Sequence, residues 1–336
     1  MRKTRRRRIR VIYLCILMLF TFVMFSTSSY AWFTANRIVT VNTINFHVGA
    51  AGGVEISADG TNWKSIISPS DIIDVHNSTY PTSVNQIPGQ LEPVSSGKEV
   101  DNGGLLKLYY GATENSASGE FNLTSTRIIE SNGSGENSNG KFLAFDLFFK
   151  TDNESNLYLT TNSNVSYTNP ETKKGIASAA RIAFINEGTV PVGSSIGDIQ
   201  RLKQGNNNTV YLWEPNYDTH TDAGVANARD VYNITTTNEN AERLEYDGII
   251  SEISRTDGVT IKTANRNSFP GFFKKVNVDF ATKTGFTEYA RAFTIGAGIT
   301  KIRVYMWIEG QDVDCENLAG YDDIDFSLEL TVNPGA

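Results

Sequence analysis

Apolar and polar side chains alternate along several segments of the chain, and this two-residue period predicts β-strands with one buried face. The alternation is clearest near the C-terminus, over residues 302–308 and 326–332. In the first segment, aliphatic residues and methionine occupy every second position, with Arg303, Tyr305 and Trp307 between them. We therefore expect two strands, each of which presents one apolar face to a core.

Other segments add to this pattern. Residues 54–56 and 63–67 flank Asp59-Gly60, a dipeptide typical of hairpin turns, and they predict a β-hairpin. Residues 141–150 carry apolar side chains on both faces, which indicates a central strand that is buried on both sides. Shorter strands are predicted at residues 157–161, 180–185 and 211–213. The last of these suits a sheet edge or a strand end, because a proline follows it.

Helical periodicity is weak. Residues 171–179 and 223–229 are short candidates, and no long segment keeps a 3.6-residue period. Many strands without regularly alternating helices predict an all-β fold, namely an antiparallel, jelly-roll-like β-sandwich with long polar loops. The clearest loops are residues 131–140 and 205–208, which are rich in Asn, Ser and Gly.

The domain organisation follows from length and from this strand pattern. We expect residues 32–336 to form a single large β-sandwich domain. Residues 187–270 are less strand-like than their flanks, and we interpret them as an elaborated insertion carried by the sandwich. No internal repeat with a fixed period is recognisable.

The first 31 residues have the layout of a secretory signal helix. Four consecutive arginines at positions 5–8 precede an apolar run over residues 11–25. Ser29 and Ala31 then occupy the −3 and −1 positions of a cleavage site, so that Trp32 becomes the first mature residue. The alternative is an uncleaved anchor, oriented by its arginines. In either case we expect export, with membrane contact only through this segment.

Removing the signal changes the charge and the cysteine count. The full chain has 30 basic and 37 acidic side chains, and residues 1–31 hold seven of the basic ones and no acids. The mature part therefore keeps 23 basic and 37 acidic side chains, a net charge of −14. Such an acidic body repels phosphate backbones, so we expect no nucleic-acid partner. Cys15 leaves with the signal, and Cys315 alone forms no intramolecular disulfide.

Catalytic motifs are missing from the sequence. The three histidines, His47, His76 and His220, are far apart and lack metal-ligand spacing, and no known nucleophile motif occurs. We therefore expect that the protein is not an enzyme and needs no cofactor.

An acidic segment near the C-terminus is the one candidate metal site. Asp312, Asp314, Glu316 and Asp323 fall at positions 1, 3, 5 and 12 of an EF-hand-like count, and closely spaced carboxylates bind Ca²⁺. Position 6, however, is Asn317 instead of glycine, and the flanks are strands. The alternatives are therefore a calcium site and a solvated turn.

Three tryptophans have two interpretations. Trp63, Trp213 and Trp307 would form a sugar-binding face if they were exposed together. Aromatic residues on strands are more often part of the core, and we favour packing.

The first mature strand is the most suggestive segment for function. Residues 36–48 alternate as a long strand directly behind the new terminus. Such a strand can pair within its own sheet, or it can complete the sheet of a neighbouring subunit. We expect residues 44–48 to stay in their own sheet. For residues 32–41 both alternatives remain open, and the donor residues would be Ile38, Val39, Thr40 and Val41.

Three short stretches resemble known bacterial proteins. Residues 29–34, with the sequence Ser-Tyr-Ala-Trp-Phe-Thr, resemble the start of TasA/camelysin-type proteins, which are exported and processed by a dedicated signal peptidase. Residues 53–64 and 304–315 are similar to surface proteins of Gram-positive gut bacteria with the same kind of signal. This chain departs from the resemblance in three ways. It is longer than a typical member, residues 187–270 have no recognised counterpart, and the basic start contains more arginines than usual.

The resemblance implies a jelly-roll subunit of an extracellular fibre or biofilm matrix that assembles by donor-strand exchange. Its partners would be copies of itself or related matrix subunits, and a signal peptidase during export. The expected location is the surface or matrix of a Gram-positive bacterium. The alternative function is a surface adhesin that binds carbohydrate or host protein.

Overall fold

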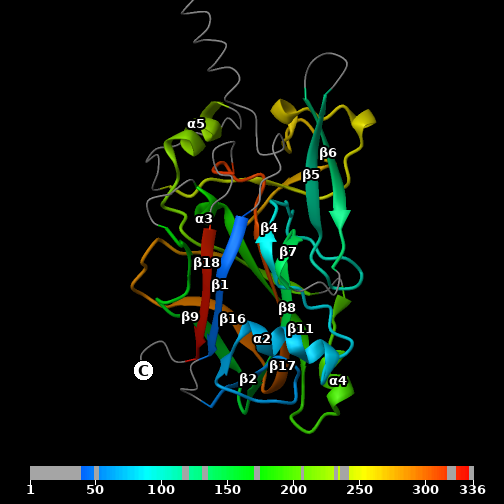
Figure 1. The fold of residues 1–336 in the computed structure, drawn as a ribbon, viewed down its shortest axis with the longest axis vertical. Coiled ribbons are helices and arrows are strands. Elements are labelled where there is room, and N and C mark those ends of the chain that lie inside the picture. The colour runs from blue at the N-terminus through cyan, green and yellow to red at the C-terminus, as the bar shows by residue number, and fades with distance from the viewer. Residues whose placement is uncertain are drawn as a thin grey trace, which may run out of the picture.

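The computed structural model describes residues 39–48, 53–115, 121–130, 135–169, 175–205, 208–230, 234, 242–315 and 323–332. Within these ranges the chain is mostly β, as predicted, and its helices are short (Figure 1). In this part of the chain, no helix is long and apolar enough to span a membrane. The signal helix predicted over residues 1–31 lies outside the described ranges.

Eight strands form the first sheet, in the order β16-β9-β18-β1-β4-β7, with β10 also paired to β18 and β3 to β1. Their bounds are β1 Val39–Val48, β3 Ile66–Ile67, β4 Pro88–Leu91, β7 Gly135–Gly140, β9 Ser155–Leu159, β10 Asn164–Tyr167, β16 Ala290–Ile295 and β18 Asp323–Thr331. The expected antiparallel arrangement is only partly right, because β1 runs parallel to β18 and β4 runs parallel to β7.

Six strands form the second sheet, in the order β15-β12-β11-β17-β8-β2. Their bounds are β2 Glu55–Ser57, β8 Leu143–Thr151, β11 Ala180–Val190, β12 Thr209–Glu214, β15 Phe280–Ala281 and β17 Gly298–Ile308. Neighbouring strands are antiparallel here, except for the short parallel pair of β12 and β15. The long strands β8, β11 and β17 lie side by side in its centre.

The two sheets pack face to face around one large apolar core. Phe293 on β16 of the first sheet lies 5.0 Å from Phe184 on β11 and 6.0 Å from Phe149 on β8, measured between ring centroids. On β18, Phe326, Leu328 and Leu330 are buried while the residues between them are half-buried, which confirms the predicted alternation. Burial of each such side chain contributes roughly 1.5–3 kcal/mol.

The other face of the second sheet is also covered. Tyr305 and Trp307 on β17 pack in a second apolar cluster with Leu106, Leu108 and Tyr246. The covering layer comes from residues 94–110 and 242–280, far from β17 in sequence. It explains why β8 is buried on both sides, as predicted. The single buried face expected for residues 302–308 is wrong, because all of β17 is buried.

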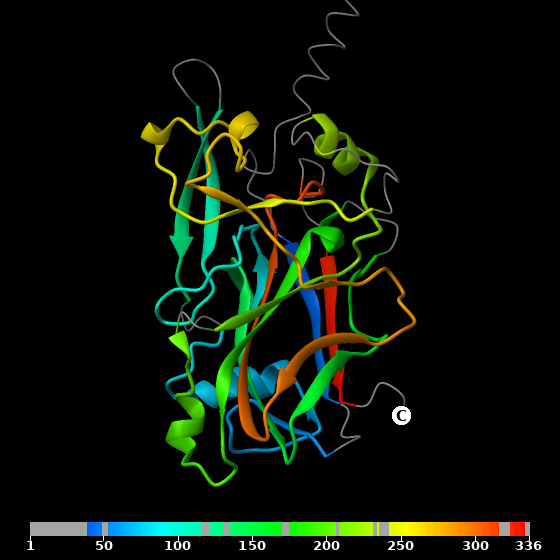
Figure 2. The same cartoon turned by 180° about the vertical axis from the view of Figure 1, so that it is seen from behind.

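The remaining elements surround this sandwich. They are the helices α2 Pro69–Asp74, α3 Ile176–Ala179, α4 Ile196–Gln200 and α5 Asp222–Asp230, the 3-10 turns η2 Val75–Asn77, η6 Arg255–Asp257 and η7 Ile261–Thr263, and the strand pairs β5 Leu108–Asn115 with β6 Phe121–Ile128 and β13 Asp247–Ile249 with β14 Phe273–Lys275. The β5–β6 hairpin and the segment holding η6 and η7 extend together beyond one end of the sheets (Figure 2).

The predicted hairpin, loop and insertion agree with the structure to different degrees. The hairpin around Asp59-Gly60 is confirmed next to its turn, where Ile56 and Lys64 exchange two backbone hydrogen bonds of 2.9 and 2.8 Å. The end of its second segment departs from the prediction, because Ile66 and Ile67 pair with β1 in the first sheet. The loop expected over residues 131–140 is wrong for its second half, which forms β7. A glycine at position 140 lets the backbone of β7 lie against Pro88 of β4. Region 187–270 supplies β12 to the second sheet as well as much of the outer layer.

Candidate functional site

The N-terminal strand β1 occupies the middle of the first sheet. It pairs in parallel with β18 from Thr40 to Val48 and meets β4 on its other side, where Val39 lies opposite Leu91 and Thr40 opposite Gln90 (Figure 1). Residues 44–48 thus lie in their own sheet, as expected. Of the four predicted donor residues, Val39 and Val41 are buried and Thr40 is half-buried, while Ile38 lies outside the described ranges.

Without β1 the first sheet would lose its central connection. On one side β18 pairs with β9 and β10, and on the other β4 pairs with β7. In the described part of the sheet, β1 alone joins these two groups by backbone hydrogen bonds. The cleavage residues Ser29, Ala31 and Trp32 lie outside the described ranges.

The acidic segment after β17 is folded into the protein and engages basic side chains. Asp312 accepts a hydrogen bond of 2.5 Å from Nη2 of Arg181, which also donates to Glu214 at 2.8 Å. Nη1 of Arg181 donates to the carbonyl oxygens of Ser178 and Ala180. The guanidinium is completely buried and bridges two buried carboxylates, a role that no sequence pattern indicates. Glu214 also accepts from Nε of Arg243 at 3.1 Å, so two cations face the two carboxylates.

Asp314, the second predicted calcium ligand, is paired with His220. Its Oδ2 lies 2.5 Å from Nδ1 of His220, and its Oδ1 accepts from the backbone N–H and the hydroxyl of Thr221. Glu316 lies outside the described ranges and Asp323 begins β18. No group of three or more His, Cys, Asp or Glu side chains suited to a metal ion occurs among the described residues.

Both ring nitrogens of His220 contact acceptors. Nε2 lies 2.8 Å from the carbonyl oxygen of Glu242, so both nitrogens donate when the ring is protonated. Burial by itself lowers the pKa of His220, but the hydrogen bond to Asp314 and the charges of Asp314 and Asp312 outweigh burial, and the pKa is raised. His220 therefore takes up a proton more readily than an ordinary histidine, and both of its ring nitrogens already face protein acceptors.

Glu309 anchors the same segment to the outer layer. Its carboxylate accepts from Nε1 of Trp307 at 3.0 Å and from the backbone N–H groups of Ser96 and Gln311. Complete burial raises the pKa of Glu309 to about 7.

A second buried network crosses β8 and β17. Arg303 donates to Asp146 at 2.8 Å and to Glu130 at 2.5 Å, and Lys301 lies 3.2 Å from Asp146. Burial alone would raise the pKa of Asp146, but Lys301 and Arg303 outweigh it and hold the pKa at about 2. Nearby, burial raises the pKa of Glu187 to about 7. The network is therefore close to neutral when Glu187 is protonated.

These groups predict that the protein loses stability as the pH rises. Glu187 and Glu309 hold protons up to about pH 7 in the folded state, whereas an unfolded chain gives them the ordinary glutamate pKa of 4.5, so stability falls as the pH rises between these values. His220, with a pKa raised above 6.5, contributes stability that is complete below that pH and is lost as the pH rises through its folded pKa.

Thermal midpoints measured between pH 5 and 9 test this expectation. We expect His220→Gln to remove the decline above about pH 7 and to leave the decline between pH 4.5 and about 7 that Glu187 and Glu309 cause. An unchanged midpoint across the range would contradict the raised pKa values of Glu187, Glu309 and His220. The same alkaline decline in His220→Gln would contradict the part assigned to His220.

The tryptophans do not form a common exposed face. Trp213 and Trp307 are fully buried, which confirms the packing interpretation for both. Trp63 is half-buried beneath Nζ of Lys150, which lies 4.7 Å from its ring centroid.

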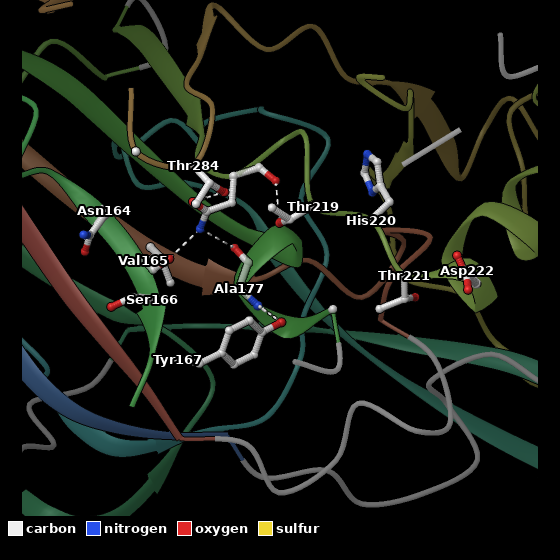
Figure 3. Close-up of a pocket in the computed structure, with 13 residues that line it drawn as sticks. Asn164, Val165, Ser166, Tyr167, Ala177, Thr219, His220, Thr221, Asp222 and Thr284 are labelled. Atoms are coloured by element: carbon white, nitrogen blue, oxygen red, sulfur yellow. Dashed lines mark hydrogen bonds between the residues drawn. The ribbon is translucent and has the colours of Figure 1, made fainter. Parts of the chain in front are cut away.

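An open cavity of about 650 Å³ lies beside β10. Figure 3 shows its walls: Val165 and Tyr167 on β10, Ala177 on α3, Thr284 on a loop, and residues 219–222 before and at the start of α5. Asn216 supports this arrangement, because its amide donates to the carbonyl oxygens of Val165 and Ala177. The volume falls within the range of roughly 300–1,000 Å³ that is common for ligand pockets.

Sequence reasoning missed this cavity because its walls come from four separate segments. Comparison of the chain with protein-family models, with curated proteins and with solved structures gives no match.

Proposed function

We propose that the protein is a secreted structural subunit of a surface fibre or biofilm matrix, and that subunits assemble by exchange of the N-terminal strand β1. The observation that carries the proposal is the position of β1, an N-terminal strand inserted between β18 and β4 at the centre of a sheet. The same strand from a neighbouring copy would restore every backbone hydrogen bond that β1 makes, so exchange conserves the pairing energy.

The chain after β1 supports such an exchange. Positions 49–53 read Gly-Ala-Ala-Gly-Gly. Glycine tolerates backbone conformations that other residues avoid, and Gly53 has a φ of 77°. A glycine-rich connection imposes little restriction on the direction in which β1 leaves the body of its own subunit.

The wider proposal includes export and fold type. Cleavage after Ala31 by a signal peptidase would release the N-terminal strand, and the partners would be copies of the same chain or related matrix subunits at the surface of a Gram-positive bacterium. We propose that the core is a modified jelly roll. The presence of two packed sheets supports this fold type. A sugar-binding tryptophan face has no support, since Trp213 and Trp307 are buried.

A reversible disulfide between β1 and β4 tests strand exchange. Thr40 and Gln90 lie opposite each other on neighbouring antiparallel strands, a position suited to a disulfide. We expect the mature double variant Thr40→Cys/Gln90→Cys to stay monomeric when it is oxidised before assembly, and to form filaments after reduction. If the reduced protein is first assembled and then oxidised, a ladder of covalent oligomers should appear on a non-reducing gel.

The matched control places the cysteines in the β5–β6 hairpin, as Ala112→Cys/Thr124→Cys, where the paired residues are also opposite each other. This variant should assemble equally well oxidised or reduced. Filaments that form readily from the oxidised Thr40→Cys/Gln90→Cys monomer, with no covalent ladder after assembly, would refute exchange of β1.

A further inference from the structure

The cavity beside β10 lies close to the point where β1 begins. Tyr167 on β10 pairs with Ile324 on β18, and Ile324 in turn pairs with Val41 on β1. Two strand spacings of about 4.8 Å each therefore separate β10 from the start of β1. Figure 1 shows α3, another wall of the cavity, at this same end of the sheet.

The residues that precede β1 are long enough to reach this cavity. Residues 32–38, with the sequence Trp-Phe-Thr-Ala-Asn-Arg-Ile, lie between the predicted cleavage point and Val39. Seven extended residues span up to about 23–25 Å at roughly 3.3–3.6 Å each. This exceeds the distance of about 10 Å between the strands, so Trp32 and Phe33 can reach the cavity from the first position of β1.

The cavity and this segment also match in chemistry. Tyr167 is half-buried and offers an aromatic ring to the cavity, whose wall also includes the almost completely buried Val165 and Ala177, and such a wall suits an aromatic side chain. Cleavage after Ala31 gives Trp32 an α-ammonium group, and Arg37 adds a second positive charge. Among the described lining residues there is no Lys or Arg, Asp222 is acidic, and Nδ1 of His220 is already paired with Asp314.

We propose that this cavity seats the mature N-terminus, with Trp32 and Phe33 bound between β10, α3 and the loop at Thr284. The occupant is residues 32–38 of the chain whose β1 fills the adjacent position in the sheet. The inference rests on the proposed function, because it requires export and cleavage after Ala31, and it holds whether β1 belongs to the same subunit or is exchanged. The aromatic pair then fastens β1 at its first residue, and an uncleaved chain lacks the free ammonium group.

Photo-crosslinking of the full mature chain tests this placement. The photoreactive residue p-benzoylphenylalanine replaces Phe33, the assembled protein is irradiated, and crosslinked peptides are identified by mass spectrometry. We expect crosslinks to Tyr167, Ala177 or Thr284. The same label in place of Ile129, whose side chain is 74% exposed, serves as the control and should not reach these residues. Crosslinks from position 33 only to other parts of the protein would overturn the proposal.

A pair of matched variants checks that the cavity itself is responsible. Thr284 is exposed and lines the cavity, whereas Thr287 is exposed on the same loop and is not among the lining residues. Thr284→Trp should lower the yield of these crosslinks about tenfold, equivalent to about 1.4 kcal/mol of binding, without changing the thermal midpoint. Thr287→Trp should leave the yield unchanged. Equal yields in both variants would contradict the assignment.

Electron microscopy of the same samples separates this inference from the proposed function. Filaments without crosslinks to the cavity would overturn the inference and leave strand exchange intact. Crosslinks to the cavity in a protein that never forms filaments would support the docking and count against the fibre proposal. Binding of a saccharide in the cavity, together with crosslinks from position 33 only elsewhere, would assign the cavity to a glycan and overturn the docking.

Discussion

Arg181→Met is expected to lower the free energy of unfolding by about 3–5 kcal/mol, the usual cost of removing one partner from a buried ion pair. Arg181 is completely buried and lies within 2.8 Å of Glu214 and 2.5 Å of Asp312. Methionine matches its length but leaves Asp312 without the guanidinium and Glu214 with Arg243 alone. The loss also releases the segment after β17 from the start of β11, because Arg181 connects the two.

Chemical denaturation of Arg181→Met and Arg201→Met measures this effect. Arg201 is the matched control, since its side chain is 73% exposed and its 3.4 Å contact with Asp198 lies in solvent. Exposed pairs of this kind contribute little, so the control should keep the denaturation midpoint of the parent protein. Equal midpoints for the two variants would show that Arg181 does not hold the two carboxylates as the structure indicates.

The strands whose side chains alternate, or are apolar throughout, were predicted well. On β18, the polar residues between Phe326, Leu328 and Leu330 are half-buried, so alternation in the sequence matches alternation in space. Residues 141–150 signalled burial on both faces directly, because both faces are apolar. In both cases the pattern reflects which faces of one strand are buried, and the residues of that strand alone carry this information.

Burial of polar side chains was not predictable in this way. Arg303 and Tyr305 on β17 occupy the positions that an exposed face would use. They are buried because residues 94–110 and 242–280 cover that side of the sheet, and because Arg303 finds Asp146 and Glu130 as partners. A two-residue period cannot report a layer contributed by distant segments or a partner that lies 157 residues away in sequence.

The acidic segment also shows that local sequence does not reveal the partners of a polar side chain. Asp312 and Asp314 have the spacing of calcium ligands, and the sequence offers oxygen atoms without showing what faces them. In the fold, Arg181 and His220 approach from 131 and 94 residues away, respectively. The walls of the cavity beside β10 also come from segments that are far apart in sequence, so local sequence does not predict it. Residues 32–38 are different, because they directly precede β1 in the sequence.

Trp213→Ala is expected to lower the free energy of unfolding by about 3–5 kcal/mol, the usual cost of removing a large aromatic side chain from a core. The Trp213 side chain is fully buried, its ring is stacked on Phe280 with an interplanar angle of 6°, and its Nε1 donates to Thr282 at 3.0 Å. Alanine would leave a cavity between β12 and β15 and an unpaired hydroxyl on Thr282. The variant should therefore unfold at a lower denaturant concentration.

Trp63→Ala is the matched control for this prediction. Trp63 is half-buried and its ring lies beneath Lys150, a contact worth about 0.5–1 kcal/mol at exposed sites. Its removal should shift the denaturation midpoint much less than the removal of Trp213. A Trp213→Ala protein with the stability of the parent protein would contradict the buried position of the indole. The expected large loss of stability would show that β12, although it lies in the region interpreted as an insertion, forms part of the core against which the sheet of β1 packs.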